Sequence, residues 1–224
     1  MQLIAKIPLQ EVVSNKLIRA YLEKNPLLNP LVDYFPDKQA FKSVMENKSK
    51  FFRHRENLVE ALLEQNKNAG AKVLENIRLL KENNTYTVTT GHQLCVLGGP
   101  AYFFHKIIHT VKLVQELAHH FPENNFVPVF WMASEDHDFE EISKLYVYGK
   151  EIKWQREANN EPVGQLSLEK IDEVFNELNE IFQNDAHALN IIKELREAYA
   201  KGQNLSESTR NFVKYYKEKY GVVI

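Results

Sequence analysis

The chain has 224 residues, and its 28 basic and 30 acidic side chains nearly cancel, giving a net charge of −2. Such a balance gives no general electrostatic reason to bind nucleic acid or an anionic membrane. No apolar run approaches the ~20 residues of a membrane span, and the first residues lack the apolar core of a signal peptide. Because Cys95 is the only cysteine, no intrachain disulfide can form, and we expect a cytoplasmic protein.

Residues 9 to 84 have the pattern of a helical region. Apolar residues recur near helical spacing between Phe52 and Leu80. Ala69-Gly70 predicts a break of this stretch into two helices. Pro26, Pro30 and Pro36 predict a loop, because proline disrupts helices and strands alike.

A strand, a helix and a second strand follow. The β-branched run Thr85 to Thr90 predicts a strand that ends at Gly91. Pro100 suits the first turn of a helix that reaches about His120. The continuous apolar run Phe126 to Ala133 is typical of a parallel strand covered on both faces. This βαβ unit predicts an α/β, Rossmann-like parallel sheet with helices on both faces.

The remaining segments predict a hairpin, three helices and a further strand. The hairpin pairs 145–148 with 152–154 around Gly149-Lys150, and the helices lie near 168–182, 185–200 and 206–219. Gly221 to Ile224 resembles the start of another buried strand. We therefore expect one Rossmann-like domain over 1–224, with a mainly helical subregion in 1–84 and an α/β core in 85–224. We also expect this core to be cut short within a longer protein.

The loop from Gly91 to Pro100 is the first candidate ligand site. It joins the end of a strand to the start of a helix, where glycines let the backbone approach a ligand and free N–H groups attract anions. It is neither a Walker A loop nor a dinucleotide fingerprint. The alternative interpretation is a tight turn that binds nothing.

The start of the following helix adds two ionisable residues. Lys106 could extend to a bound anion, and His105 could act as an acid or a base. His105 and His109 have the i, i+4 spacing of metal ligands, but no Glu follows the first His as in the zinc motif HExxH. We therefore expect no metal site here, and a solvated polar face explains His109 better.

The second strand ends in Glu135-Asp136-His137-Asp138, which is the second candidate site. Crowded carboxylates are unfavourable unless they bind or cap something. Asp138 is suited to cap the helix that begins at Phe139, which leaves the others for amine recognition, general base catalysis or Mg²⁺. Trp131 is expected in the core with a wet indole edge.

Cys95 lies in the loop at a helix entrance, where a nucleophile could be placed. A small buried apolar residue is the commoner role of a single cysteine, and the sequence shows no base beside it.

Four segments in order resemble the cysteine ligase family of bacillithiol biosynthesis, the BshC family. They are Thr90-Gly-His-Gln, Gly98-Gly-Pro-Ala-Tyr-Phe-Phe-His-Lys, the segment from Pro128 to Ile142 that contains Trp-Met-Ala-Ser-Glu-Asp-His-Asp-Phe-Glu-Glu-Ile, and Pro162-Val-Gly164. The family often has Gln at the position of His92 and a small residue other than cysteine at the position of Cys95. These departures argue against Cys95 as a nucleophile.

The resemblance implies a Rossmann-like core laid out as in class I synthetases, with a coiled coil in the full-length protein and a homodimer as one arrangement of it. It implies a ligase that adds L-cysteine to glucosaminyl-malate, for which ATP or ADP is a plausible co-substrate. With the strand-end rule it also assigns the site residues. The catalytic set is Glu135, Asp136, His137 and His105, and the substrate-binding set is Gly91, His92, Gln93, Gly98, Gly99, Tyr102, Lys106, Trp131 and Asp138.

Two other functions remain open. A nucleotidyl or acyl-adenylate transferase would use the glycine loop and Lys106 to hold phosphates. A non-catalytic α/β module would dock a partner through its helices, although the ionisable strand end argues against this hypothesis.

Overall fold

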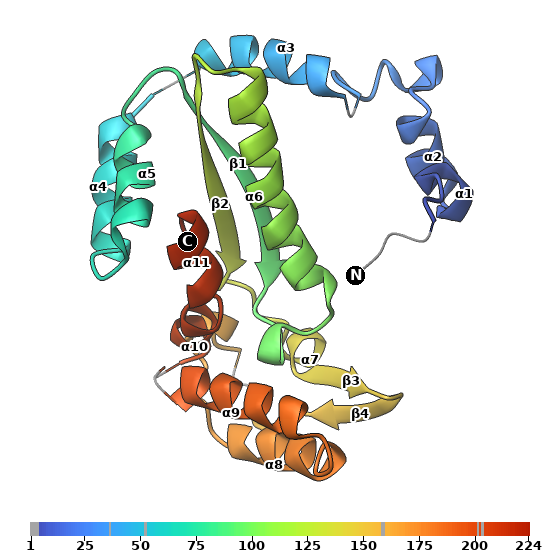
Figure 1. The fold of residues 1–224 in the computed structure, drawn as a ribbon, viewed down its shortest axis with the longest axis vertical. Helices are drawn as coiled ribbons and strands as arrows, with labels where there is room; N and C mark the ends of the chain where they lie inside the picture. The colour runs from blue at the N-terminus through green and yellow to red at the C-terminus, as the bar shows by residue number, and fades with distance from the viewer. Residues whose placement is uncertain (1–4, 36, 52, 158–159, 201, 203) are drawn as a thin grey trace. The chain divides into compact units, whose positions relative to one another are not determined.

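The computed structural model describes residues 5–35, 37–51, 53–157, 160–200, 202 and 204–224. Figure 1 shows the order of the elements along the chain. Two compact units share the chain, Met1–Arg53 and His54–Ile224. The expectation that residues 9–84 are mainly helical is confirmed, although the boundary between the units falls inside that region.

The first unit is a set of short helices: α1 (Leu9–Val12), α2 (Lys16–Leu22), a 3-10 helix (Pro26–Leu28) and α3 (Lys38–Ser49). Side-chain oxygens cap three of them: Asn15 accepts hydrogen bonds from the first amides of α2, Asn25 accepts one from Leu27 in the 3-10 helix, and Asp37 accepts one from Ala40 of α3. Lys24 also pairs with Asp37 at 2.6 Å. Of the described residues of this unit only Leu28 and Met45 are buried, so its own core is small.

The second unit contains the sheet and the remaining helices. Its strands are β1 (Thr85–Gln93), β2 (Asn125–Ala133), β3 (Lys144–Val147) and β4 (Lys150–Lys153). Its α-helices are α4 (Arg55–Gln65), α5 (Ala71–Leu79), α6 (Tyr102–His120), α7 (Phe139–Ile142), α8 (Ile171–Ile181), α9 (Ala186–Ala200), α10 (Leu205–Phe212) and α11 (Lys214–Tyr220). The predicted helix break lies between α4 and α5, and the predicted hairpin is formed by β3 and β4.

The two long strands confirm the predicted βαβ unit. They are parallel, in a register that runs from Thr85 beside Asn125 to Gln93 beside Ala133, and α6 connects them. The end of the chain continues the sheet on the other side of β2. Val223 donates to the carbonyl of Pro128 at 2.9 Å and accepts from Phe130 at 2.9 Å, so this segment pairs with β2 in parallel, as a further strand would.

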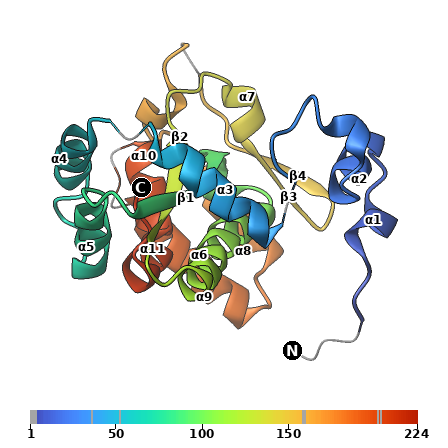
Figure 2. The same cartoon turned by 90° about the horizontal axis from the view of Figure 1, so that it is seen from above.

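Helices cover both faces of the sheet because β2 is apolar on both (Figures 1 and 2). Phe130 and Met132 pack with Phe103 and Ile107 of α6 on one face. On the other face Val127 belongs to a second cluster, together with residues of α4 and α5 such as Val59, Val73 and Ile77. The expected Rossmann-like architecture is therefore observed.

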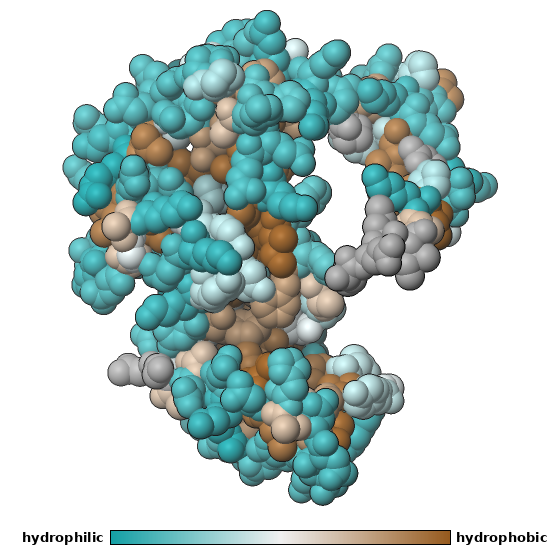
Figure 3. Space-filling view, in the orientation of Figure 1, coloured by the Kyte–Doolittle hydropathy of each residue, from teal (hydrophilic) through white to brown (hydrophobic). Residues whose placement is uncertain are grey.

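The larger of the two hydrophobic clusters, which contains Phe103 and Phe130, extends beyond the carboxyl ends of β1 and β2 into the hairpin and α7 to α10. Trp154 is fully buried there, and its indole N–H donates to the carbonyl of Glu169 at 2.7 Å. Tyr199 of α9 and Phe175 of α8 pack edge to face. In Figure 3 apolar side chains show between the hydrophilic outer surfaces near α8 and α9.

Three details differ from the expectations. Pro100 lies before α6 rather than in its first turn, because positive φ at Gly98 and Gly99 delays the helix until Tyr102. The helix expected at 206–219 is two helices, which meet at Val213. Trp131 is 61% exposed rather than in the core, because the helices on its face of the sheet cover Val127 and Val129 but do not cover Trp131.

Candidate functional site

The site lies where β1 and β2 end. Gln93 and Ala133 are the last residues of their strands and neighbours in the register, so the segments that follow leave the sheet together. Parallel strands place their carboxyl ends at one edge, and ligands of open α/β sheets bind outside that edge. Both candidate segments of the sequence meet here.

Gln93 joins the two segments directly. Its side-chain Nε2 donates to Asp136 Oδ2 at 2.8 Å and to Glu141 Oε2 at 2.8 Å. One amide therefore holds two carboxylates that lie 43 and 48 residues further along the chain. Hydrogen bonds to ionised groups are stronger than those between neutral groups, so this contact fixes the relative position of the two acids.

Asp136 is held as a carboxylate. Its Oδ1 accepts hydrogen bonds from the backbone N–H groups of His137 at 2.7 Å and Asp138 at 3.3 Å. The bond from Gln93 first, and then those from the two amides, lower the pKa of Asp136 below its ordinary value of 3.8. An acid with a lowered pKa is suited to bind a cation and is a weak proton donor at neutral pH.

The capping of α7 places Glu141 in the site. Asp138 accepts a hydrogen bond from the backbone N–H of Glu141 at 3.0 Å, as expected of an N-cap residue. Glu141 thus lies in the first turn of α7, where its side chain reaches back to Gln93. Glu141 was not predicted as a site residue, although it lies three residues after the predicted cap Asp138, where the side chain of a capped helix is held in place.

The backbone N–H groups of the glycine loop already donate to acceptors within the protein. Leu97 N donates to the hydroxyl of Tyr199 at 2.7 Å, Gly98 N to the carbonyl of Cys95 at 2.9 Å, and Gly99 N to the carbonyl of Val96 at 3.0 Å. These three amides are therefore not free for an anion, unlike the arrangement expected of a phosphate loop. A side chain at Gly98 would lie 2.8 Å from the Phe212 ring, so this glycine is needed for close packing.

His92 and Cys95 lie together under the loop. Both are buried, and Cys95 Sγ is 4.0 Å from His92 Nδ1. Nδ1 also lies 2.7 Å from the carbonyl oxygen of Gln93. Because a carbonyl only accepts, Nδ1 carries the proton and cannot remove one from the thiol. Burial, followed by the nearby charge of Glu141, raises the pKa of Cys95, which makes it a poor nucleophile.

The residues at the start of α6 border the site. Lys106 Nζ donates to the carbonyl of Gly91 at 3.1 Å and lies 5.3 Å from the centre of the Tyr102 ring. The ring of Tyr102 also contacts the imidazole of His92, at a centroid distance of 5.1 Å. His105 is exposed one turn further along, and within the described residues its side chain makes no hydrogen bond.

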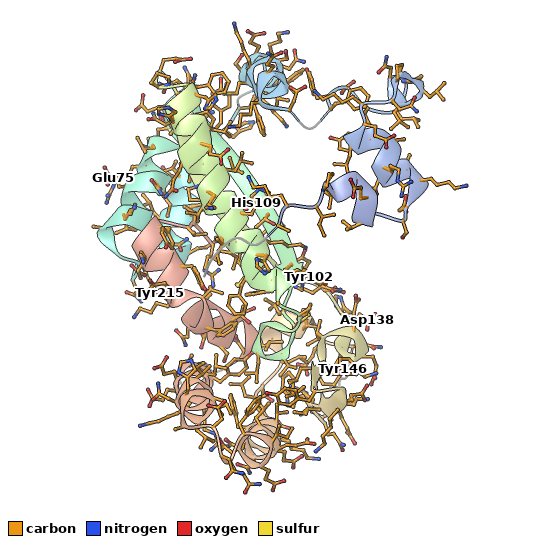
Figure 4. All side chains as sticks on the ribbon, turned by 45° about the vertical axis from the view of Figure 1, so that its right-hand side comes forward. Glu75, Tyr102, His109, Asp138, Tyr146 and Tyr215 are labelled. Atoms are coloured by element: carbon orange, nitrogen blue, oxygen red, sulfur yellow. The ribbon has the colours of Figure 1, made fainter. Side chains whose placement is uncertain are left out.

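A cavity of about 760 Å³ opens beside Gln93. Its walls come from the glycine loop, the start of α6, α7 and the first strand of the hairpin, and its lining includes Gln93, Cys95, Leu97, Gly99, Tyr102, Glu140, Glu141, Lys144, Leu145 and Tyr146. Figure 4 shows the labelled Tyr102, Asp138 and Tyr146 on neighbouring elements at this end of α6. The wall is apolar on the loop side and acidic on the α7 side.

The structure separates the predicted residues into two groups. Those that line the cavity or contact its lining include Gln93, Gly99, Tyr102, Asp136 and Asp138. Trp131 pairs with Gly91 in the register, whereas its neighbour Met132 pairs with His92. Successive residues of a strand point to opposite faces, so Trp131 points away from the face that packs against α6. Glu135 and His137 are exposed on the turn after β2.

The hairpin supplies lining residues that were not predicted from the sequence. Lys144 and Tyr146 line the cavity, and Lys144 lies 3.8 Å from Glu140. Within the described residues, no three His, Cys, Asp or Glu side chains are grouped as a metal site would require. No described helix combines the length and the apolar character needed to cross a membrane.

Comparison with known proteins adds the family. The description "Bacillithiol biosynthesis BshC, N-terminal Rossmann-like domain" matches residues 2–224. The protein named "Putative cysteine ligase BshC" from Flavobacterium johnsoniae is 40% identical over 214 residues, which cover 94% of this chain and 40% of that protein. Its namesake from Cytophaga hutchinsonii is 37% identical over 224 residues, covering 99% of this chain and 41% of that protein.

A more distant relative of the same name, from Bacillus cytotoxicus, is 39% identical over 152 residues, covering 66% of this chain and 27% of that protein. The chain thus spans about 40% of the length of its more similar curated relatives. Both the fold and the matched range agree with the family description. The chain belongs to the bacillithiol biosynthesis BshC family, and residues 2–224 correspond to its N-terminal Rossmann-like domain.

Proposed function

We propose that the cavity beside Gln93 is the substrate site of a ligase that joins L-cysteine to the amine of glucosaminyl-malate in bacillithiol biosynthesis. Family membership and the names of the relatives support the ligase and the pathway. The observation that carries the site is the Gln93 amide, which lines the cavity with Glu141 and donates hydrogen bonds both to Glu141 and to Asp136, a carboxylate outside the lining. The identity of the two substrates, L-cysteine and glucosaminyl-malate, is the part that we propose beyond the family.

The chemistry of the wall fits an amine. Both proposed substrates carry an amino group, and an ammonium ion is stabilised by nearby carboxylates. Asp136 is an ionised acid, and Glu141 adds a second carboxylate through the same amide. The apolar loop side of the cavity, with Val96 and Leu97, suits the remaining carbon and sulfur atoms of cysteine.

Formation of the amide bond also requires proton transfer and activation. The attacking amine must lose a proton, and we assign this step to the exposed imidazoles at this edge of the sheet, His105 or His137, because histidine titrates near neutral pH. A carboxylate must be activated before an amine attacks it, and a nucleotide such as ATP or ADP fits that role. The occupied amides of residues 97–99 give no support to the alternative of a phosphate-transferring loop.

The test uses the protein as its gene encodes it. Isothermal titration calorimetry measures binding of L-cysteine, glucosaminyl-malate and ATP, and mass spectrometry measures the coupled product. We expect Glu141→Gln to weaken binding of at least one amine substrate about tenfold, because a charge-assisted hydrogen bond is lost.

Glu180→Gln is the matched control, because this exposed α8 carboxylate is outside the cavity lining and has no hydrogen bond or ion pair with a described residue. Equal affinity of Glu141→Gln and the control for both substrates would refute the site. Binding of ATP alone, with no response to either amine, would favour a nucleotidyl transferase. No response to any of the three compounds would favour a non-catalytic module.

A further inference from the structure

The segment Pro162-Val-Gly164 lies beside the turn that follows β2, residues 134–138, which carries Asp136. It leads into the 3-10 helix Val163–Gln165, in which Val163 and Gly164 are buried. None of these three residues lines the cavity beside Gln93. The segment can therefore act on the proposed amine site only through the turn.

Two backbone hydrogen bonds join the segment to the turn. The N–H of Val163 donates to the carbonyl oxygen of Asp136 at 2.7 Å, and the N–H of Gly164 donates to the carbonyl oxygen of Ser134 at 2.9 Å. The amide of Gln93 holds the carboxylate of Asp136 at 2.8 Å. Asp136 is thus held twice, through its side chain by the end of β1 and through its main chain by Val163.

Gly164 permits this close approach because it has no side chain. A Cβ at this position would lie 2.6 Å from Ser134 Cβ and 2.8 Å from the Ser134 carbonyl oxygen, and it would also contact Ser206 Oγ of α10. The carbonyl oxygen belongs to the main chain of the turn and cannot rotate away as the end of a flexible side chain can. Any larger residue at position 164 would therefore push the turn away from the segment.

The other side of the segment is fixed in the core. Val163 and Leu166 are both 0% exposed and belong to the larger hydrophobic cluster. The backbone N–H of Leu205, at the start of α10, donates to the carbonyl of Leu166 at 3.0 Å. Because the segment is packed and bonded in this way, it can set the position of the more exposed turn.

We propose that Gly164 is a positioning residue of the site beside Gln93, and that the Val163–Gly164 backbone places Asp136 for binding of the substrate amine. The effect on the amine rests on the proposed ligase function, whereas the hold on Asp136 does not. A displacement of the turn by about 1 Å would break the 2.8 Å hydrogen bond between Gln93 and Asp136, because hydrogen bonds require close contact.

The test compares Gly164→Ala with Gly202→Ala in the protein as its gene encodes it. A Cβ on Gly202 would lie 2.6 Å from Ser208 N and 2.9 Å from Ser208 Cα, so the control also crowds α10 and main-chain atoms, but not the turn. Both variants should lower the free energy of unfolding in urea. Only Gly164→Ala should raise the pKa of Asp136, because only there is the bond from Gln93 lost.

The pKa of Asp136 is measured by NMR titration of its carboxyl carbon, which Asp136→Asn identifies. By calorimetry, Gly164→Ala should also weaken binding of the amine substrate about fivefold, and Gly202→Ala should leave it unchanged. An Asp136 pKa equal to that of the wild type in Gly164→Ala, or raised equally in the control, would overturn the proposal.

The two readouts separate this proposal from the proposed ligase function. If Glu141→Gln weakens amine binding while Gly164→Ala raises the pKa of Asp136 but leaves amine binding unchanged, the amine site stands and the role of Gly164 in it is refuted. If the wild type binds neither amine substrate, the ligase function is refuted, and the pKa of Asp136 still decides whether the segment holds this acid.

Val163→Pro and Val163→Ala serve if Gly164→Ala does not fold. Proline removes the N–H that donates to Asp136, and it suits the first position of a 3-10 helix after Pro162, whose ψ is 132°. Alanine removes more of the side chain but keeps the N–H. Val163→Pro should therefore raise the pKa of Asp136 more than Val163→Ala does, and equal values would show that this hydrogen bond does not position the acid.

Discussion

The side-chain amide of Gln93 donates to Asp136 at 2.8 Å and so ties the end of β1 to the turn that follows β2. The same nitrogen reaches Glu141 on α7. The Gln93 side chain therefore connects three segments that border the proposed amine site: the end of β1, the turn after β2, and α7.

Gln93→Ala should lower the free energy of unfolding only slightly but should clearly lower the affinity for the amine substrate. The variant leaves two carboxylates without their shared donor, but both are at least partly exposed and can be solvated by water. We therefore expect the free energy of unfolding, measured by urea denaturation, to fall by about 1 kcal/mol. The binding free energy of the amine substrate should fall by more than this. Gln115→Ala on the exposed side of α6 is the control and should change neither quantity.

Asp136→Asn should change how stability depends on pH. Because the pKa of Asp136 is lowered in the folded protein, its contribution to stability is present above its ordinary pKa of 3.8 and is lost as the pH falls through the folded value. The urea midpoint of the wild type should thus fall more steeply than that of Asp136→Asn as the pH falls below about 5. Parallel pH curves for the two proteins would contradict the described hydrogen bonds.

The sheet was predictable from sequence, whereas the contacts of the site were only partly so. Continuous apolar runs bounded by turn residues locate β1 and β2, and parallel pairing follows from the helix between them. The partner of Gln93 does not follow from local patterns, because its amide can bond to any acceptor and Glu141 is 48 residues away. Trp131 was misplaced because an apolar run does not reveal where the covering helices stop. Long-range packing therefore decides which polar residues become site residues, while local patterns decide which elements carry them.

Cys95→Ala and Cys95→Ser should both retain the ligase activity that we propose for the protein as its gene encodes it. The thiol is buried, its pKa is raised by burial, and the nearest imidazole nitrogen already donates to a carbonyl. Accordingly, a thiol reagent should label native Cys95 far more slowly than the unfolded chain. Rapid labelling of the native protein, or loss of activity in a variant that remains folded, would show that the thiol takes part in catalysis.

Gly99→Ala should be strongly destabilising, and Gly149→Ala is its matched control. Both glycines have positive φ, at 60° and 80°. A Cβ on Gly99 would lie 2.7 Å from Cys95 Cβ, whereas one on Gly149 would meet no atom within 4 Å. We expect Gly149→Ala to lose about 1 kcal/mol from backbone strain and Gly99→Ala to lose about 1–3 kcal/mol more. Equal losses in urea unfolding would mean that the loop shifts to relieve the clash.

Tyr199→Phe should loosen the glycine loop without opening a cavity. The Tyr199 hydroxyl accepts a hydrogen bond from Leu97 N at 2.7 Å, and the side chain is 1% exposed. Removing the oxygen leaves this amide unpaired in a buried position, which should lower the free energy of unfolding by about 1–3 kcal/mol and speed hydrogen exchange at Leu97. Tyr215→Phe is the control, because Tyr215 is 60% exposed and its hydroxyl accepts a hydrogen bond from Lys219 at the surface, so its loss should be much smaller. If the two variants are equally stable, α9 does not hold the loop through this bond.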